Sequence, residues 1–334
     1  MVRGVRRATL AAVAAGAVAA AFTAHAAQAP PTRNVVHLVW APGPQLALDA
    51  ATPTWTDTRR LFVLRGGRFT MFGPEVIDGI EWSPRGDLIA IGGFALYVIR
   101  PDGTGLRRLA GNTAGLGAWS PDGSRILFAS GDGYLWVIGR DGRGAHRLAL
   151  INNNFDAHAV WSPDGRRVAF QACRPGRDPD VCDGQVLDLF VVGADGKGLR
   201  RITHRSLGDQ CRLSWAPARD IAYGTDAGAT VVATPAGKVH RRIRGFTCAT
   251  WSPDGKRLLG WARGVPAITR ADAGSPRAVV HYHDRAVIGQ GPAVPVWSQD
   301  GTQIAFDRVY FRDGSPLSHD FIADLRTKGI RKLP

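Results

Sequence analysis

Polar side chains gather in the short segments that precede a recurring tryptophan, and these segments hold residue types that could do chemistry. The candidate ligand-binding residues in them are Asp78, Glu81, Asn154, Asp156, His158, Asp209 and Arg212. Asp156 and His158 alternate along a possible strand, so they are expected to face the same way. If the segments converge on one mouth, their side chains would form a polar or cation-binding pocket. In the simpler interpretation they line a water-filled channel.

Two further clusters resemble metal sites without matching one. In "HYHD", His281 and His283 share a strand face beside Asp284, but no third ligand is assignable nearby, which favours surface histidines. "DPDVCDG" misses the calcium-loop spacing by one residue, which favours a solvated loop; its acids are Asp178, Asp180 and Asp183. The sequence has no phosphate loop, dinucleotide fingerprint or nucleophile–base constellation. We therefore expect no catalytic residue, no metal and no cofactor.

The recurring tryptophan indicates which elements position these residues. Its copies are Trp40, Trp82, Trp119, Trp161, Trp215, Trp251 and Trp297, at spacings of 42, 37, 42, 54, 36 and 46 residues. A period of about 40 residues is typical of propeller blades. The copies "WAPGPQ" at Trp40 and "WAPARD" at Trp215 are degenerate and one residue shorter than "WSPDGR" and its relatives.

Each module shows the same order of strand and turn signals. A short inner strand leads to the tryptophan, and "SPDG" then has the residues of a type I turn. An alternating strand follows, and a third strand ends at an Asp-Gly turn before the fourth. These signals predict an all-β protein, a seven-bladed β-propeller of four-stranded antiparallel blades, or six blades if the copy at Trp40 is not a module.

The seven tryptophans are expected to be structural anchors. Strands twist, so neighbouring blades leave a wedge between them, and an indole that buries ~150–250 Å² can fill it. Trp136 and Trp261 fall in strand patterns and are expected in the core. Trp55 lies in a polar stretch and is expected to be exposed.

The first 26 residues have the features of a cleavable signal peptide. Basic residues begin the chain, the apolar stretch 8–22 follows, and "AHA" supplies a small-x-small cleavage site. We expect residues 27–34 to be a short linker and residues 35–334 to be the propeller. The protein is thus expected to be exported, periplasmic or extracellular, with no membrane span after cleavage. Arg6 and Arg7 leave the general secretory and twin-arginine routes open.

Four cysteines in an exported chain indicate two disulfides. Cys173 and Cys182 flank one polar loop, whereas Cys211 and Cys248 each precede a module tryptophan. The pairs Cys173–Cys182 and Cys211–Cys248 are therefore favoured among three possible pairings. A zinc site is disfavoured because no C-x-x-C pair is present.

The basic composition does not indicate a nucleic-acid-binding protein. The formal charge of +14 falls by three when the signal peptide is removed, and the remaining arginines are scattered over every repeat. Nucleic-acid binding would require a basic tract interleaved with aromatic residues, and the chain has none. We expect a monomer.

"WSPDG", a basic residue and "IAF" or a close variant, followed by "LYV…DG…RRL", resemble the WD40-like PD40 repeat of the TolB-family propellers. The resemblance covers about residues 35–334 and implies the propeller fold only. TolB carries an additional N-terminal α/β domain for which this chain has no room. The hydrolase domain that follows PD40 blades in peptidases of the prolyl oligopeptidase type, with its G-x-S-x-G elbow, is also missing.

The sequence therefore predicts an exported, non-catalytic TolB-like propeller that acts as a protein- or ligand-binding scaffold at the cell envelope. The alternative is a propeller enzyme, a lyase or hydrolase, or a sugar-binding module with its site at the central channel. An enzyme is expected to cluster several of the axial carboxylates with His158 around one pocket.

Overall fold

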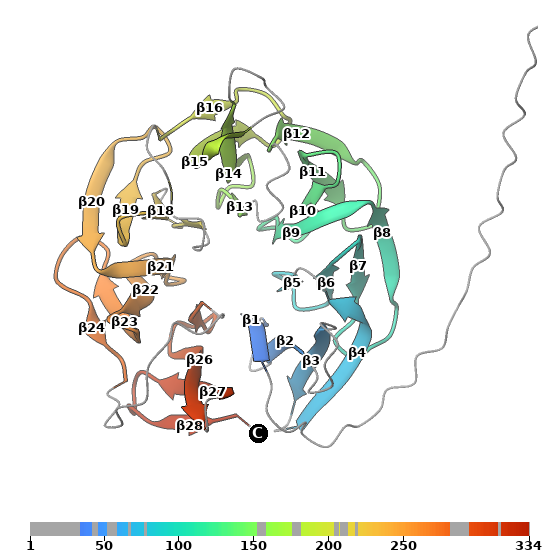
Figure 1. Ribbon diagram of the computed structural model, residues 1–334. Helices are drawn as coiled ribbons and strands as arrows, with labels where there is room; N and C mark the ends of the chain where they lie inside the picture. The colour runs from blue at the N-terminus through green and yellow to red at the C-terminus, as the bar shows by residue number, and fades with distance from the viewer. Residues whose placement is uncertain are drawn as a thin grey trace, which may run out of the picture.

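The protein forms a ring of β-sheets, shown by a computed structural model (Figure 1). The structure describes residues 34–41, 46–51, 59–65, 68–76, 79–151, 158–175, 182–203, 207, 213–217, 220–280, 294–312 and 315–333. Within these ranges 28 strands form seven four-stranded antiparallel sheets, and each sheet contains one of the seven module tryptophans. The predicted β-propeller is confirmed, and the degenerate copy at Trp40 forms a sheet of its own. A helix suited to crossing a membrane is not found in the described residues.

The blades follow one another along the chain. Blade 1 comprises β1 (Asn34–Trp40), β2 (Leu46–Ala51), β3 (Arg59–Arg65) and β4 (Arg68–Val76). Blade 2 comprises β5 (Gly79–Trp82), β6 (Ile89–Gly92), β7 (Ala95–Ile99) and β8 (Arg107–Gly111). Blade 3 comprises β9 (Thr113–Trp119), β10 (Arg125–Ser130), β11 (Tyr134–Gly139) and β12 (His146–Leu150). Blade 4 comprises β13 (Ala159–Trp161), β14 (Arg167–Pro175), β15 (Cys182–Gly193) and β16 (Arg200–Arg201).

The remaining three blades complete the ring. Blade 5 comprises β17 (Ser214–Trp215), β18 (Ile221–Thr225), β19 (Ala229–Ala233) and β20 (Val239–Arg244). Blade 6 comprises β21 (Phe246–Trp251), β22 (Arg257–Ala262), β23 (Val265–Arg270) and β24 (Arg277–Ala278). Blade 7 comprises β25 (Val296–Trp297), β26 (Gln303–Arg312), β27 (Ser315–Asp324) and β28 (Ile330–Lys332).

Every blade runs from the axis outward in chain order, so the strand that ends at the tryptophan is innermost (Figure 1). In the described sheets no strand is shared between the first blade and the last. The ring instead closes by packing: Phe62 and Leu64 of blade 1 lie in one buried cluster with Ala305 and Ile322 of blade 7.

Antiparallel order gives the ring two different faces. First strands end and second strands begin at one face, which we call the SPDG face. Second strands end and third strands begin at the other face, where the inner strands also start, and we call it the hairpin face. The predicted type I turn is present: the Gly123 N–H donates to the Ser120 carbonyl over 2.8 Å, and Gly123 has φ +65°, which favours glycine.

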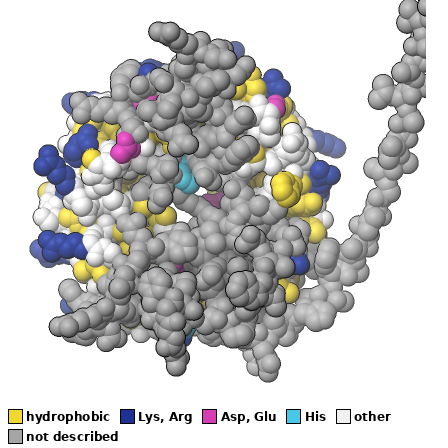
Figure 2. All heavy atoms as spheres, viewed as in Figure 1, with side chains coloured by type: hydrophobic (Ala, Val, Ile, Leu, Met, Phe, Trp, Pro, Cys, Tyr) yellow, Lys and Arg dark blue, Asp and Glu magenta, His cyan; other side chains and the backbone are white. Residues whose placement is uncertain are grey.

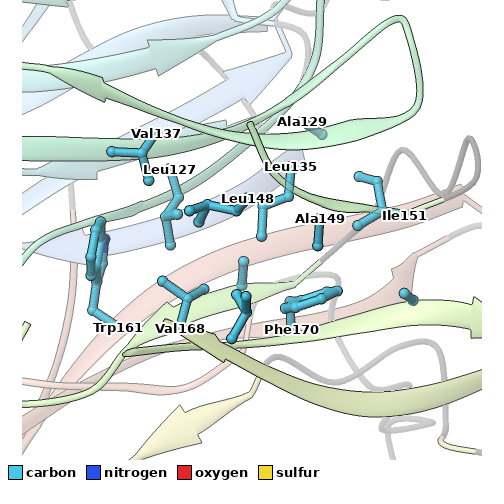
Figure 3. Close-up of a cluster of buried hydrophobic side chains, with 13 residues drawn as sticks. Leu127, Ala129, Leu135, Val137, Leu148, Ala149, Ile151, Trp161, Val168 and Phe170 are labelled. Carbon is cyan, nitrogen blue, oxygen red and sulfur yellow. The ribbon is translucent and has the colours of Figure 1, made fainter. Parts of the chain in front are cut away.

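The core lies between the blades. Leu127, Leu135 and Val137 of blade 3 face Trp161 and Phe170 of blade 4 (Figure 3). Each such cluster removes apolar surface from water at ~25 cal/mol per Å².

The module tryptophans occupy these junctions as predicted. Five of them are buried and Trp40 and Trp251 are half-buried. Trp261 is buried, Trp136 is half-buried and stacks on Phe128, and Trp55 lies outside the described residues.

Candidate functional site

The repeated serine and aspartate of each module are used by the turn. The hydroxyls of Ser120 and Ser298 donate to the carboxylates of Asp122 and Asp300 over 2.6 and 2.7 Å. Each carboxylate also accepts a backbone N–H two residues further on. The serine hydroxyl is the main reason that the pKa of Asp122 and of Asp300 is lowered to about 2. These exposed acids therefore cap turns on the SPDG face.

In three blades the repeated tryptophan is hydrogen-bonded to the blade before it. The indole N–H of Trp119 donates to the Glu81 carbonyl and that of Trp161 to the Ala118 carbonyl, both over 3.1 Å. Trp297 bonds the Thr250 carbonyl over 3.3 Å. In every case the acceptor is the residue just before the tryptophan of the preceding blade. The motif therefore carries an inter-blade hydrogen bond that its sequence alone does not show.

Three of the seven tryptophans lack this bond. The buried indole nitrogens of Trp40, Trp82 and Trp251 have no hydrogen-bond partner within the described part of the chain. Trp82 and Trp251 follow the degenerate modules of Trp40 and Trp215, and Trp40 stands where the ring closes. A buried donor left unpaired costs about 1–3 kcal/mol. Degenerate sequence and incomplete junctions thus coincide.

The arginine two residues after "SPDG" clamps the next blade. Arg125 lies over the ring of Trp161, with 4.5 Å from its guanidinium carbon to the ring centroid, and donates to the Gly165 carbonyl over 3.0 Å. Arg257 repeats both contacts on Trp297 and Gly301, at 4.8 and 3.1 Å. The partners are about one repeat away in sequence, which explains why sequence reasoning missed the clamp.

A second set of clamps lies at the start of the outer strands. His146 contacts the Ala194 carbonyl over 3.0 Å, and Arg200 donates to the Pro235 carbonyl over 2.7 Å. Equivalent bonds join Arg107 to the Arg140 carbonyl and Arg241 to the Arg270 carbonyl. The arginines that appear scattered in the sequence therefore recur at positions that join blades.

Few of the predicted axial residues can be placed. Asp78, Asn154, Asp156, Asp209 and Arg212 lie outside the described residues, as do His281, His283, Asp284, Asp178 and Asp180, and the side chain of Asp183 is likewise not described. Glu81 is the third residue of β5 and is half-buried, and His158 immediately precedes β13 on the hairpin face. These two belong to blades 2 and 4, which are not neighbours. The described residues contain no group of three or more His, Cys, Asp or Glu that could hold a metal ion.

Beside His158 lies a polar side chain that the sequence did not single out. The Gln171 backbone N–H donates to the His158 carbonyl over 3.1 Å, in the middle of β14. The Gln171 side chain is fully buried, and neither its Oε1 nor its Nε2 has a hydrogen-bond partner among the described residues. Ala169, two residues earlier, packs in the cluster shared with blade 5, so Gln171 faces that blade too. A buried amide without partners marks a position where a bound group would supply the missing bonds.

Buried acids occur at similar positions along the strands of blades 4 and 7. Asp188 is fully buried and pairs with Arg201 over 2.6 Å and with the Thr203 hydroxyl over 3.0 Å. Asp307 and Asp320 stand directly opposite each other on β26 and β27, and both are buried. Blades 4 and 7 also have the two hairpins with the longest strands, which project on the hairpin face. None of these acids precedes a module tryptophan, so the motif did not indicate them.

The cysteines can be checked only in part. Cys248 is buried, has φ +51° and takes part in a disulfide. Cys211 lies outside the described residues, so the pairing of Cys211 with Cys248 stays a prediction. The backbones of Cys173 and Cys182 lie on the adjacent strands β14 and β15, where Cys182 is opposite Pro175. The pairing of these two also stays a prediction.

The hairpin face carries an exposed aromatic side chain between blades 2 and 3. Phe94, in the turn between β6 and β7, is 79% exposed. Its carbonyl accepts the Thr113 N–H over 3.2 Å, and the Asn112 carbonyl accepts the Gly131 N–H over 2.8 Å. These bonds connect the Phe94 turn to the hairpin turn of blade 3.

Next to that turn, blade 3 presents a stack of aromatic and basic groups. The guanidinium of Arg147 lies 4.4 Å from the ring centroid of Tyr134 and 5.3 Å from that of Trp136. Arg147 also pairs with Asp132 over 3.0 Å. Cation–π contacts of this kind contribute ~0.5–1 kcal/mol each when exposed. We call Phe94, Tyr134, Trp136 and Arg147 the aromatic ledge.

Comparison with known proteins supports the fold and does not extend to function. No protein-family model matches the chain, and no curated protein matches it. It is similar to the solved structure of an oligogalacturonate lyase in complex with manganese, with a TM-score of 0.59 and 13% identity over 91% of this chain and 90% of that one. A chain of a nidogen/laminin complex gives a TM-score of 0.47 and 12% identity over 68% of this chain and 89% of that one. At 13% identity the likeness to the lyase structure shows the β-propeller fold alone.

Proposed function

We propose that this chain is an exported binding scaffold of the TolB-like PD40 kind whose hairpin face receives a protein or cell-envelope partner. The observation that carries the proposal is Phe94. Among the described large apolar side chains that are exposed, it has the greatest exposure, 79%, and it is the one on the hairpin face. An exposed aromatic side chain surrounded by polar groups is typical of a protein-interaction surface.

The aromatic ledge gives this surface its chemistry. Tyr134 and Trp136 supply apolar area with a polar atom at one end, and Arg147 supplies hydrogen-bond donors. These three residue types are enriched at the centres of protein interfaces. The repeated tryptophans, arginines and aspartates are used by junctions and turns, whereas the Phe94 side chain is in none of the buried clusters of the described residues.

The test is capture of the partner by chemical crosslinking in the exporting cell, with Phe94→Ser compared with Leu199→Ser. Leu199 is 53% exposed and immediately precedes the outer strand β16 near the opposite, SPDG face, so it controls for loss of any exposed apolar side chain. The wild type and Leu199→Ser are expected to capture the same partner, and Phe94→Ser at least about fivefold less of it. Equal capture by all three, or capture by none, would contradict the proposal.

A second candidate function is a lyase, hydrolase or sugar-binding activity at the axial mouth. Gln171 favours it, since its buried amide lies beside His158 with no hydrogen bond of its own. The structurally similar lyase was solved in complex with manganese. Manganese and oligogalacturonate are therefore the probes to use.

Gln171→Met separates this candidate from a purely structural explanation. If Gln171 contacts a ligand, the wild type will bind manganese or oligogalacturonate by calorimetry and the variant will not. If the amide has no ligand, neither protein will bind either probe. In that case the variant will be more stable, by about 1–3 kcal/mol, because it no longer buries an unpaired amide.

A further inference from the structure

The ring closes at a seam between blade 7 and blade 1, which lie side by side in Figure 1. In the described residues this seam has neither of the contacts that the repeated motif makes at the junction of blades 3 and 4. The Trp40 indole nitrogen is buried without a hydrogen-bond partner there. Gln303 occupies the position of the clamping arginine, since its carbonyl accepts the N–H of the residue after the module tryptophan, as the Arg125 carbonyl does in blade 3. Other contacts must therefore hold these two blades together.

The apolar part of the seam shows how the two blades face each other. Phe62 of β3 packs in one buried cluster with Ala305 of β26 and Ile322 of β27. Leu61 and Val63, on either side of Phe62, pack instead with blade 2. The pairing of β3 with β2 and of β26 with β27 is regular throughout, so side chains alternate along these strands without interruption. Every second residue of β3 therefore faces blade 7.

Three charged residues lie at this seam one step nearer the hairpin face. Arg60 comes two residues before Phe62 on β3, Asp307 comes two residues after the alanine of the cluster, and Asp320 comes two residues before its isoleucine. Third strands run from the hairpin face to the SPDG face and second strands run the opposite way, so all three steps lead to the hairpin face. Arg60 therefore faces the two aspartates across the seam.

The two aspartates need a cation. Asp307 is 1% exposed and Asp320 is 8% exposed, and the two stand directly opposite each other on β26 and β27. Cβ atoms of residues paired in this way are ~4.5–5.5 Å apart, so two negative charges there repel. Buried charges are stable only when they are paired.

Arg60 is placed to supply that cation. It is half-buried, and its Nη1 donates to the Gly73 carbonyl over 3.4 Å, which connects the guanidinium to β4. The lysine and arginine side chains visible in Figure 2 lie along the rim of the ring, whereas alternation turns Arg60 into a junction. On blade 7 itself, Arg331 of β28 is exposed and so supplies no buried charge.

We propose that Arg60, Asp307 and Asp320 form an electrostatic latch at which the ring opens and recloses. With the latch closed, one guanidinium is shared between two carboxylates and joins the first blade to the last. With the latch open, the three groups are hydrated separately and the two ends of the ring part without breaking a sheet. The latch is separate from the aromatic ledge and does not depend on the function proposed above.

The experiment measures hydrogen exchange of the β3 and β27 amides by mass spectrometry, because exchange reports how often a junction opens. Arg60→Met removes the cation, and Arg60→Met/Asp307→Asn/Asp320→Asn removes all three charges. The matched control is Arg201→Met, since Arg201 pairs with the buried Asp188 over 2.6 Å within blade 4 and joins no second blade. Arg60→Lys keeps the charge and is measured as well, so that a variant close to the wild type is available.

Arg60→Met is expected to speed exchange in β3 and β27 at least about tenfold, because removing one partner of a buried ion pair leaves an uncompensated charge. The triple variant is expected to exchange more slowly there than Arg60→Met, since it buries no lone charge. Arg60→Lys should show a smaller increase in the same strands. Arg201→Met should leave exchange in β3 and β27 within about twofold of the wild type, since the sites are independent.

Three results would overturn the proposal. One is exchange like that of the wild type in both Arg60 variants. Another is exchange in the triple variant as fast as in Arg60→Met, which would indicate that Arg60 acts by packing alone. The third is an equal increase in β3 and β27 in Arg201→Met, which would show that loss of any buried ion pair loosens the ring.

Discussion

The junction between blades 3 and 4 and the junction between blades 5 and 6 are built from equivalent positions with different residues. At the first, Trp161 bonds the Ala118 carbonyl and Arg125 covers the Trp161 ring. At the second, the Trp251 indole nitrogen is buried without a partner within the described residues. Asp220 stands in blade 5 where Arg125 stands in blade 3, since each carbonyl accepts the backbone N–H of the residue that follows the tryptophan of its own blade.

This difference shows what the repeat is for. "WSPDGRR" supplies an indole donor, a capped turn and, as its last residue, an arginine that reaches the next blade. "WAPARD" lacks the Ser and the Asp-Gly pair, and Asp220 stands at the position of that arginine. Blade 5 still forms a four-stranded sheet, so these residues are not needed to make a blade. They strengthen the contact between blades. The motif therefore stabilises the packing of neighbouring blades, and its degenerate copies occur at weaker junctions.

The largest effect is expected from deleting an anchor at the intact junction. Trp161→Ala removes a buried indole, leaves the Ala118 carbonyl without its partner and uncovers Arg125. Large-to-small changes of this kind cost about 3–5 kcal/mol. Trp251→Ala should cost less, because Trp251 is half-buried and makes no indole hydrogen bond. Urea unfolding of both variants measures the difference, and equal losses would contradict it.

A smaller loss is expected from removing a clamp. Arg257→Met breaks the contacts with the Trp297 ring and the Gly301 carbonyl and should lower the free energy of unfolding by about 1–2 kcal/mol. Lys256→Met changes the neighbouring exposed cation of the same turn and serves as the control, with a change under about 0.5 kcal/mol. Thermal unfolding followed by circular dichroism distinguishes them. Similar losses in both would argue against the clamp.

Replacing indole by phenyl isolates the hydrogen bond. Trp161→Phe and Trp251→Phe remove similar volume, but only Trp161→Phe breaks a bond that the structure contains. The loss in Trp161→Phe should therefore exceed that in Trp251→Phe by about 1 kcal/mol, the net value of one hydrogen bond. Paired urea titrations on the two variants give this difference. A larger loss in Trp251→Phe would contradict the prediction that the indole contributes more to the junction between blades 3 and 4 than to the junction between blades 5 and 6.

The smallest effect concerns the capped turns in acid. The pKa of Asp122 is about 2 in the folded chain, below the ordinary value of 3.8 for an aspartate, so its ionised carboxylate stabilises the fold at pH values above about 4. This stabilisation is lost as the pH falls toward 2. Asp122→Asn is therefore expected to be less stable than the wild type near neutral pH, with the gap narrowing between about pH 4 and pH 2. Urea midpoints across that range measure the gap, and a constant gap would contradict the assignment.

The sequence predicted the blades because their signals are local. At Trp40 or Trp161, the tryptophan, the turn that follows it and the alternating strand lie within about ten residues of one another. One module therefore contains the signals for its own strands and turn. The clamp of Arg125 on Gly165 joins residues one repeat apart, and nothing near Arg125 indicates its partner. Contacts between blades depend on how the sheets pack around the axis.

The candidate site was predicted less well for a related reason. The residues before each tryptophan were the predicted candidates, and they include Glu81 and His158. Gln171 was not predicted because it lies inside a strand with an ordinary pattern. Its significance comes from full burial without a hydrogen bond, which no sequence motif encodes. Phe94 was missed because exposure of a single phenylalanine depends on how short the hairpin of blade 2 is.

Hydrogen exchange tests most directly whether the repeated residues hold the blades together. Mass spectrometry of the wild type can compare the amides of β13 and β14, at the intact junction, with those of β17 and β18, in the degenerate blade. We expect slower exchange in β13 and β14, and faster exchange in β17 and β18, because a weaker junction opens more often. Equal protection of the two blades, or stronger protection of blade 5, would show that the motif does not set the strength of the junction.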